Sequence, residues 1–320
     1  MALRPLIVIR HIPNLNFMGW HKIGFALSLV MTLGSIILFL VQGLNYGIDF
    51  AGGTLIEVRS VSGPADLAGM RAKLDGLGLG EVALQGFGSA EEVLIRVPRQ
   101  PGDDKAQMAA VEKVKAALGT SVDYRRTEVV GPKVGGELVR AGVIATILAL
   151  LAIAAYVWFR FEWPFGVGAM LSTVHDTVTT VGVFSLLQIE FNLTTLAAIL
   201  TIAGYSINDT VVIYDRVRET MRKYKTIEFK DLINKSLNET LSRTVLTVST
   251  VALAVLALLI FGGEVLRGFS IAMLWGVVVG TYSSLFIAAP LLYYIRPRRG
   301  GRGKIAEIRD DLEAEPQKAR

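Results

Sequence analysis

The chain has 320 residues, 52% of them hydrophobic and 19% charged, with a formal net charge of +5 and no cysteine. Several apolar runs reach the roughly 20 residues that a helix needs to cross a bilayer, so the composition predicts a polytopic α-helical membrane protein. The basic residues cluster in a few segments between these runs, which is typical of cytoplasmic loops and argues against a nucleic-acid partner. The lack of cysteine excludes disulfides, thiol catalysis and cysteine-bound metals.

The first apolar run, residues 23–41, is longer than the core of a signal peptide and has no small-residue cleavage site after it. We therefore predict a first transmembrane helix at 23–41 that follows a cytoplasmic N-terminus at 1–22. The next segment is rich in glycine and contains one acid; we expect it to form a tight, shaped hinge, with Gly47, Asp49, Gly52 and Gly53 as its key residues. A plain helix-to-strand connection is the alternative.

Residues 42–136 contain the one soluble-looking region. Its hydrophobic periodicity predicts strands and helices in the order β-α-β-β-α-β, at about 54–60, 64–77, 81–86, 92–97, 104–118 and 121–130. This order is that of the ferredoxin-like α+β fold. The region has no histidine and no obvious pair of catalytic acids, so binding or lever action is favoured over catalysis. Gly131 and Pro132 lead the chain back to the membrane.

Five further transmembrane helices are predicted, which makes six in total, at 137–159, 165–187, 193–215, 241–261 and 269–293. Residues 216–240 are expected to form a cytoplasmic loop containing an amphipathic helix that lies on the inner membrane surface, because apolar residues recur there at three- and four-residue spacing. Residues 294–320 are a basic cytoplasmic tail.

The fourth of these helices contains an unusual acid. Between Leu193 and Tyr214 the only full charge is Asp209, and an Asp near the centre of a membrane helix costs roughly 2.5–3.5 kcal/mol on insertion scales. Arg243, in the first turn of the next helix, starts from the same side of the membrane and is long enough to reach Asp209. A permanently paired or protonated structural carboxylate is the alternative for Asp209, and snorkelling to the interface is the alternative for Arg243.

His175 and Asp176 lie near the middle of the third helix. Neighbouring residues on a helix point about 100° apart, so at most one of the two faces Asp209 directly. A proton relay and local hydrogen bonding explain this pair equally well. The chain has no G-x-x-x-x-G-K-[ST] motif for nucleotide hydrolysis, so we expect neither an enzyme nor a cofactor or metal site.

Seven segments together resemble the SecD/SecF family of the bacterial protein-export machinery, in the right order between about residues 15 and 295. They are 47–53, Gly131-Pro132 with Gly135, 175–177, 204–212, the Asp215, Arg216, Arg218 and Glu219 group, 242–244 and 261–263. This family is similar to the resistance-nodulation-division transporters, in which six helices and an extracytoplasmic domain form half of a twelve-helix core. The resemblance therefore implies a separate SecD chain that supplies the other half.

The resemblance also implies an activity. Members use the proton-motive force to help draw preproteins through the SecYEG channel after the SecA-driven step, with YajC and YidC as further partners. By this resemblance Asp209 is the proton-carrying acid and Arg243 a functional arginine, His175 and Asp176 belong to the proton pathway, and the Asp215 group marks the cytoplasmic end. It places the chain in the bacterial inner membrane, with both termini cytoplasmic and the 42–136 domain periplasmic.

The mechanism we expect is a two-state exchange. Asp209 is ionised and paired with Arg243 in one state, and is protonated from the outer side in the other, which allows the helices to repack and the periplasmic domain to move. The coupling ion is the proton, with sodium as an alternative. Two other functions stay open: a drug or lipid exporter of the same superfamily, and a purely structural assembly factor of the channel.

Overall fold

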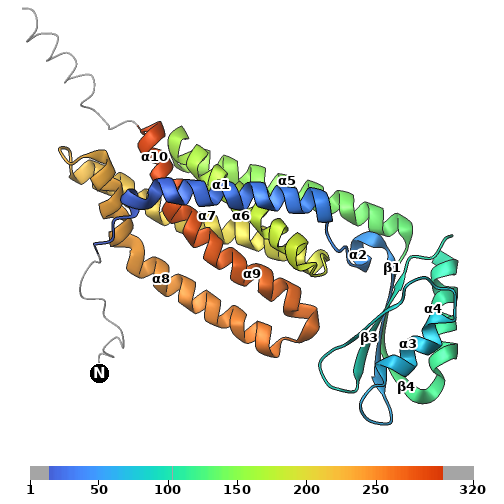
Figure 1. Ribbon diagram of the computed structural model, residues 1–320. Helices are drawn as coiled ribbons and strands as arrows, with labels where there is room; N and C mark the ends of the chain where they lie inside the picture. The colour runs from blue at the N-terminus through green and yellow to red at the C-terminus, as the bar shows by residue number, and fades with distance from the viewer. Residues whose placement is uncertain (1–13, 103, 298–320) are drawn as a thin grey trace, which may run out of the picture.

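The computed structural model describes residues 14–102 and 104–297, so the outer parts of the predicted cytoplasmic ends, 1–13 and 298–320, lie outside the described residues. The chain forms a long helical bundle with a small α/β domain at one end (Figure 1). The connection between α7 and α8 lies at the opposite end of the bundle.

Among the described residues, five helices are long and apolar enough to cross a membrane. The stretches concerned are Phe17–Gln42, Val134–Arg160, Leu193–Lys223, Phe229–Phe261 and Leu266–Ile295. They belong to α1 (Phe17–Gln42), α5 (Pro132–Arg160), α7 (Leu193–Lys223), α8 (Phe229–Phe261) and the run formed by α9 (Gly263–Ser283), the π-helical turn η2 (Ser284–Ala288) and α10 (Ala289–Ile295).

The predicted third span corresponds to α6 (Trp163–Leu187), which is not among these five helices. It has 25 residues, but its middle is rich in hydroxyl side chains besides His175 and Asp176. These polar side chains are mostly buried, because α6 packs against α1, α7 and α9. A helix enclosed by other helices can carry polar groups that lipid would not tolerate, so a sixth span stays a prediction.

The region 216–261 differs from the expected loop, surface helix and span. Helix α7 continues to Lys223, and α8 is one unbroken helix over Phe229–Phe261. No glycine or proline interrupts residues 229–261, so nothing in the sequence forces a break at 240. The apolar face that suggested a surface helix is instead buried in the protein core, with Leu232, Ile233 and Leu237 fully enclosed.

The small domain follows the order α2 (Ile48–Ala51), β1 (Gly53–Ser60), α3 (Leu67–Asp75), β2 (Ala83–Gly86), β3 (Glu92–Pro98), α4 (Asp104–Leu118) with the 3-10 turn η1 (Gly119–Ser121), and β4 (Val122–Val130). Its sheet has the strand order β2-β3-β1-β4, with every neighbouring pair antiparallel. Alternate side chains such as Ile56, Val58 and Ile95 are buried in a core shared with α3 and α4. The opposite face of the sheet carries Leu55 and Arg96 and has no helix of the domain on it.

Glycines allow α9 to approach α7 closely in the bundle. A Cβ added to Gly276 would lie 2.3 Å from Cγ1 of Ile202, and one added to Gly280 would lie 3.2 Å from Cβ of Ser206. The two helices therefore meet almost backbone to backbone. This contact brings the polar side chains of α9 within reach of α6 and α7.

We predict that Gly276→Ala destabilises the protein by about 1–3 kcal/mol, because the added methyl overpacks against the stiff side chain of Ile202. The matched control is Gly34→Ala on α1, where no described atom lies within 4 Å of the added methyl. This control should be neutral or stabilise by up to about 1 kcal/mol. Thermal unfolding of the detergent-solubilised protein, followed by tryptophan fluorescence, measures both, and equal melting temperatures for the two variants would contradict the prediction.

Candidate functional site

A fully buried carboxylate joins three helices in the middle of the bundle. Oδ2 of Asp176 on α6 accepts hydrogen bonds from Oγ of Ser206 on α7, at 2.5 Å, and from Oγ of Ser283 on α9, at 2.7 Å. Ser172 donates in turn to Ser283 at 2.8 Å. A buried acid needs such donors because no water reaches it, so the three helices are fixed to one another at this point.

His175 completes this cluster from within α6. Its Nδ1 lies 2.9 Å from the other carboxylate oxygen of Asp176, and its ring packs on Tyr282 with centroids 6.2 Å apart. Nε2 is buried and has no hydrogen-bond partner among the described residues. When Nδ1 carries the proton it donates to Asp176, which leaves Nε2 as a free acceptor. The two residues are therefore bonded to each other and, through Asp176, to α7 and α9, and no hydrogen bond or ion pair joins either of them to Asp209 among the described residues.

Asp209 occupies a second polar position on α7, about 24 Å along the helix from Leu193 at a rise of 1.5 Å per residue. Its Oδ1 accepts a hydrogen bond from Oγ1 of Thr244 on α8 at 2.8 Å. Its Oδ2 is buried and has no described partner. The residue as a whole is half-buried, next to the exposed side chain of Asn208. One oxygen is thus held, and the other is open to a new donor or a proton.

The expected ion pair between Asp209 and Arg243 is not formed. The charge of Arg243 acts on Asp209 from nearby, but the arginine side chain is exposed and no described carboxylate lies within ion-pair distance of it. The reason is helical geometry: Arg243 and Thr244 are consecutive and point about 100° apart, so the buried threonine meets Asp209 and the arginine turns outward. The structure brings Asp209 and Arg243 into the same region without direct contact.

A π-helical turn adjoins both polar positions. Ser284, the first residue of η2, is hydrogen-bonded to Thr210 on α7 at 2.7 Å, while its neighbour Ser283 binds Asp176. Beyond η2, the hydroxyl of Tyr294 on α10 lies 2.7 Å from Nε2 of His21 on α1. π turns within α-helices are frequent at functional sites. Here the end of α9 binds α6, the turn η2 binds α7, and α10 binds α1.

The predicted hinge residues gather where the small domain meets the bundle. Gly52 and Gly53 have φ of +73° and +131°, values that favour glycine, and Gly131 caps the start of α5 just before Pro132. Gly47 has an ordinary φ, yet a Cβ there would lie 2.4 Å from Oε1 of Glu190. Its small size is needed for close packing. The first hinge segment is therefore docked on the α6–α7 connection.

Glu190 in that connection forms an ion pair with Arg96 on β3 of the small domain. Both side chains are largely buried, with 26% and 24% exposed. Burial raises the pKa of the Glu190 carboxyl above its ordinary value; the Arg96 guanidinium opposes this shift and nearby Asp49 adds to it. Sequence analysis did not identify either partner, because the pairing depends on how the domain docks.

The four residues predicted at the cytoplasmic end lie together at the end of the bundle far from the sheet. Asp215 pairs with Arg160 of α5 at 2.9 Å, and Arg216 pairs with both Glu219 and Glu239 of α8 at 2.7 Å. Arg218 lies 3.9 Å from Asp215 and stacks over the ring of Phe161. Such half-exposed pairs contribute little energy individually, but they link the ends of α5, α7 and α8.

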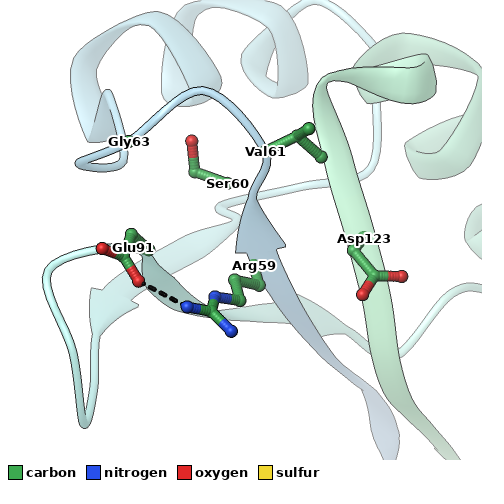
Figure 2. Close-up of a pocket in the computed structure, with 6 residues that line it drawn as sticks. All are labelled: Arg59, Ser60, Val61, Gly63, Glu91 and Asp123. Atoms are coloured by element: carbon green, nitrogen blue, oxygen red, sulfur yellow. Dashed lines mark hydrogen bonds and ion pairs between the residues drawn. The ribbon is translucent and has the colours of Figure 1, made fainter.

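A shallow cavity of about 340 Å³ lies on the small domain, at the end of β1 far from the bundle (Figure 2). It is lined by Arg59, Ser60, Val61, Gly63, Glu91 and Asp123. Arg59 pairs with Glu91 across it at 2.9 Å. None of the residues predicted for a functional site lines this cavity. No group of three or more His, Asp or Glu in the described parts of the chain is arranged to hold a metal ion.

Three hydroxyl residues at the intramembrane sites were missed by sequence reasoning, namely Ser206, Ser283 and Thr244. Serine and threonine are common in membrane helices, so none stands out from composition alone. Thr244 follows Arg243 directly, and Ser206 lies one turn before Asp209 on the same helix. Ser206 and Thr244 also lie within the segments 204–212 and 242–244 that carry the family resemblance, but the sequence did not indicate that they bind the two carboxylates.

Comparison with known proteins identifies the family. Residues 110–298 match the family described as protein export membrane protein SecD/SecF, C-terminal, and residues 37–62 match the SecD/SecF GG motif. Protein translocase subunit SecF from Rickettsia felis is 45% identical over 93% of this chain and 97% of its own length. Protein translocase subunit SecF from Cereibacter sphaeroides is 43% identical over 91% of this chain and 92% of its own length.

Solved structures agree. The crystal structure of SecDF, a translocon-associated membrane protein from Thermus thermophilus, superposes with a TM-score of 0.78 and 37% identity over 92% of this chain. SecDF in its super-membrane-facing form gives a TM-score of 0.68 and 36% identity over 98% of this chain. This chain spans 40% and 41% of those two solved chains. From the matched segments, the full-length relatives and the shared architecture, the chain belongs to the SecD/SecF family of protein-export membrane proteins.

Proposed function

We propose that this chain works as the smaller half of a two-part, proton-driven protein translocase in the bacterial inner membrane. The observation that carries the proposal is the environment of Asp209, a half-buried acid at mid-helix with one oxygen bound by Thr244 and the other without a partner. An acid in such a position can exchange a proton with little rearrangement of the groups that already hold it. Its relatives are named as protein translocase subunits.

The partner half would cover the face of the bundle that carries Asp209. On α7 this face exposes Thr201, Gly204 and Asn208, and on α8 it exposes Arg243. Polar residues on lipid-facing surfaces are costly, so a protein neighbour is the better environment for them. The solved relatives are SecDF chains more than twice as long as this one, which supports a SecD chain as that neighbour.

The proposed architecture is six transmembrane helices and one periplasmic ferredoxin-like domain. Helix α6 supplies the sixth span, since its polar residues are mostly buried inside the bundle and Asp176 is hydrogen-bonded to neighbouring helices there. The strand order β2-β3-β1-β4 and the β-α-β-β-α-β chain order support the ferredoxin-like fold. The basic residues in the last turns of α7 and the first turns of α8, among them Arg222, Lys223 and Lys230, favour a cytoplasmic position for that end, which puts the sheet domain outside.

In the proposed cycle, a proton from the outer side neutralises Asp209 and is later released inward. One proton crossing 100 mV supplies about 2.3 kcal/mol, enough to shift a two-state equilibrium substantially. His175 and Asp176 belong to the same pathway, and the proton is the coupling ion, with no cofactor. The motion would help a preprotein through the SecYEG channel after the SecA-driven step, with YajC and YidC as accessory partners.

A structural scaffold is the second candidate. The absence of an ion pair between Asp209 and Arg243 favours it, because the expected charge switch is not visible as a direct contact. The two functions differ in what happens when only the charge of Asp209 is removed. A scaffold would tolerate that change, and a proton-driven device would not.

We predict that Asp209→Asn abolishes proton-gradient stimulation of preprotein export while the complex stays assembled, because the amide keeps the shape but cannot carry a proton. The measurement is completion of export in inverted vesicles that contain this chain, its SecD partner and the channel. Asp231→Asn, which neutralises an exposed acid in the first turn of α8, is the control and should retain stimulation. Undiminished stimulation in Asp209→Asn would favour the scaffold.

Two substitutions at Asp176 distinguish its contribution to stability from its proposed role in the proton pathway. Asp176→Ala removes the acceptor of two buried hydroxyls and should lower stability by about 1–3 kcal/mol. Asp176→Asn keeps an acceptor oxygen, so it should retain most of the stability and lose proton-stimulated export. Thermal unfolding and the vesicle assay measure the two effects, with the exposed Asp231→Ala as control. Wild-type export in Asp176→Asn would remove Asp176 from the pathway.

A further inference from the structure

The segment that leads into the small domain is paired with the connection between α6 and α7. The amide of Gly47 donates to the carbonyl of Phe191 at 2.9 Å, and the amide of Phe191 donates to the carbonyl of Asn45 at 2.7 Å. The rings of Phe50 and Phe191 stack with centroids 5.7 Å apart. Two chain segments that are about 145 residues apart in sequence therefore behave as one structural piece.

The same piece includes the start of the helix that carries Asp209. The amide of Leu193, the first residue of α7, donates to Oδ2 of Asp49 at 2.9 Å. Asn192 caps the same helix through the amide of Thr195 at 3.0 Å. The first turn of α7 thus receives one acceptor from its own connection and one from α2 at the base of the small domain. Because α7 is one continuous helix from Leu193 to Lys223, an axial movement of the part that carries Asp209 also moves its first turn.

Only one ion pair extends this piece to the sheet itself, among the described residues. Glu190 pairs with Arg96, which is on β3 and therefore belongs to the rigid sheet. The carboxylate of Glu190 rests on Gly47, and Nε of Arg96 is buried with no hydrogen-bond partner. On the other side, a Cβ at Gly135 of α5 would lie 3.1 Å from the carbonyl oxygen of Phe50. The base of the domain is enclosed by α5 and the α6–α7 connection.

These contacts connect α7 in the bundle with the sheet of the small domain. The inference drawn from them rests on the proposed function. We propose that Glu190 and Arg96 are positioning residues that transmit the movement of α7 to the small domain. A largely buried, hydrogen-bonded ion pair fixes orientation better than an exposed one, because both charges lose water as alternative partner. Without this pair, α7 would still respond to protonation, but the sheet would follow it less closely, because the link from α2 to β1 runs through Gly52 and Gly53.

The test is a charge exchange. Arg96→Glu and Glu190→Arg should each lower proton-stimulated export at least about fivefold, the lower end of usual coupling effects, while proton flux out of the vesicle lumen, which corresponds to the outer side of the cell membrane, persists. The double variant restores an opposite-charge pair and should return export to within about twofold of wild type. The matched control exchanges Arg59 and Glu91, an exposed ion pair at the far end of the same sheet (Figure 2), and each of its variants should export normally.

Two results would overturn the proposal: single variants that export like wild type, or a double variant that stays as impaired as the single ones. Parallel loss of proton flux and export would also contradict it. Failure of the proposed function has a different signature, since Asp209→Asn would then retain both flux and export. The experiment therefore separates the two.

A distance measurement distinguishes loss of coupling between the bundle and the sheet from loss of export through poor folding of a variant. The chain has no native cysteine, so spin labels can be placed at Ala90→Cys on the sheet hairpin and Leu187→Cys at the end of α6, both exposed. In the wild-type background we expect a single narrow distance distribution. Glu190→Gln should broaden it, whereas Glu91→Gln should not. An unchanged distribution in Glu190→Gln would overturn the proposal.

Discussion

The carboxylate of Asp176 has no access to water, and the centre of the bundle is organised around its need for hydrogen-bond donors. Ser206 and Ser283 can serve it only because Gly280 lets α9 come close to α7 at the same level. Three helices are therefore held in register by one side chain. Leaving such a group unsatisfied costs far more than any single apolar contact contributes, so this cluster holds the three helices together close to the half-buried Asp209.

Three polar layers follow one another along α7, and they differ in how tightly they are enclosed. Asp49 binds the first turn, Ser206 and Asp209 lie in the middle, and Arg216 forms ion pairs near the far end. In the middle layer Ser206 is fully buried against α6, whereas Asp209, which faces α8, is half-buried. The proposed proton exchange at Asp209 depends on this difference between the two sides.

Sequence reasoning found the unusual residues but not their partners. An ionisable residue stands out in a long apolar run, which is why Asp209, His175 and Asp176 could be singled out as candidates from the sequence. Hydroxyl donors such as Thr244 are not visible in this way, since their importance appears only when two helices are packed. The Asp209–Arg243 pair expected for one of the two states is not formed in this structure, because depth along a helix can be estimated from sequence, whereas the rotation that turned Thr244 inward could not. The continuity of α8 was missed for a related reason, since burial of its apolar face depends on tertiary packing.

The π turn η2 also sets a limit on how this sequence can change in length. It accommodates one more residue per turn than its flanking helices, and the parts before and after it bind different neighbours, Ser283 at Asp176 and Tyr294 at His21. Removal of one residue from 284–288 would turn everything beyond it by about 100° and shift it by about 1.5 Å. Insertions and deletions within this short stretch would therefore rotate Tyr294 away from His21 or Ser283 away from Asp176, although both pairs of residues would still be present in the chain.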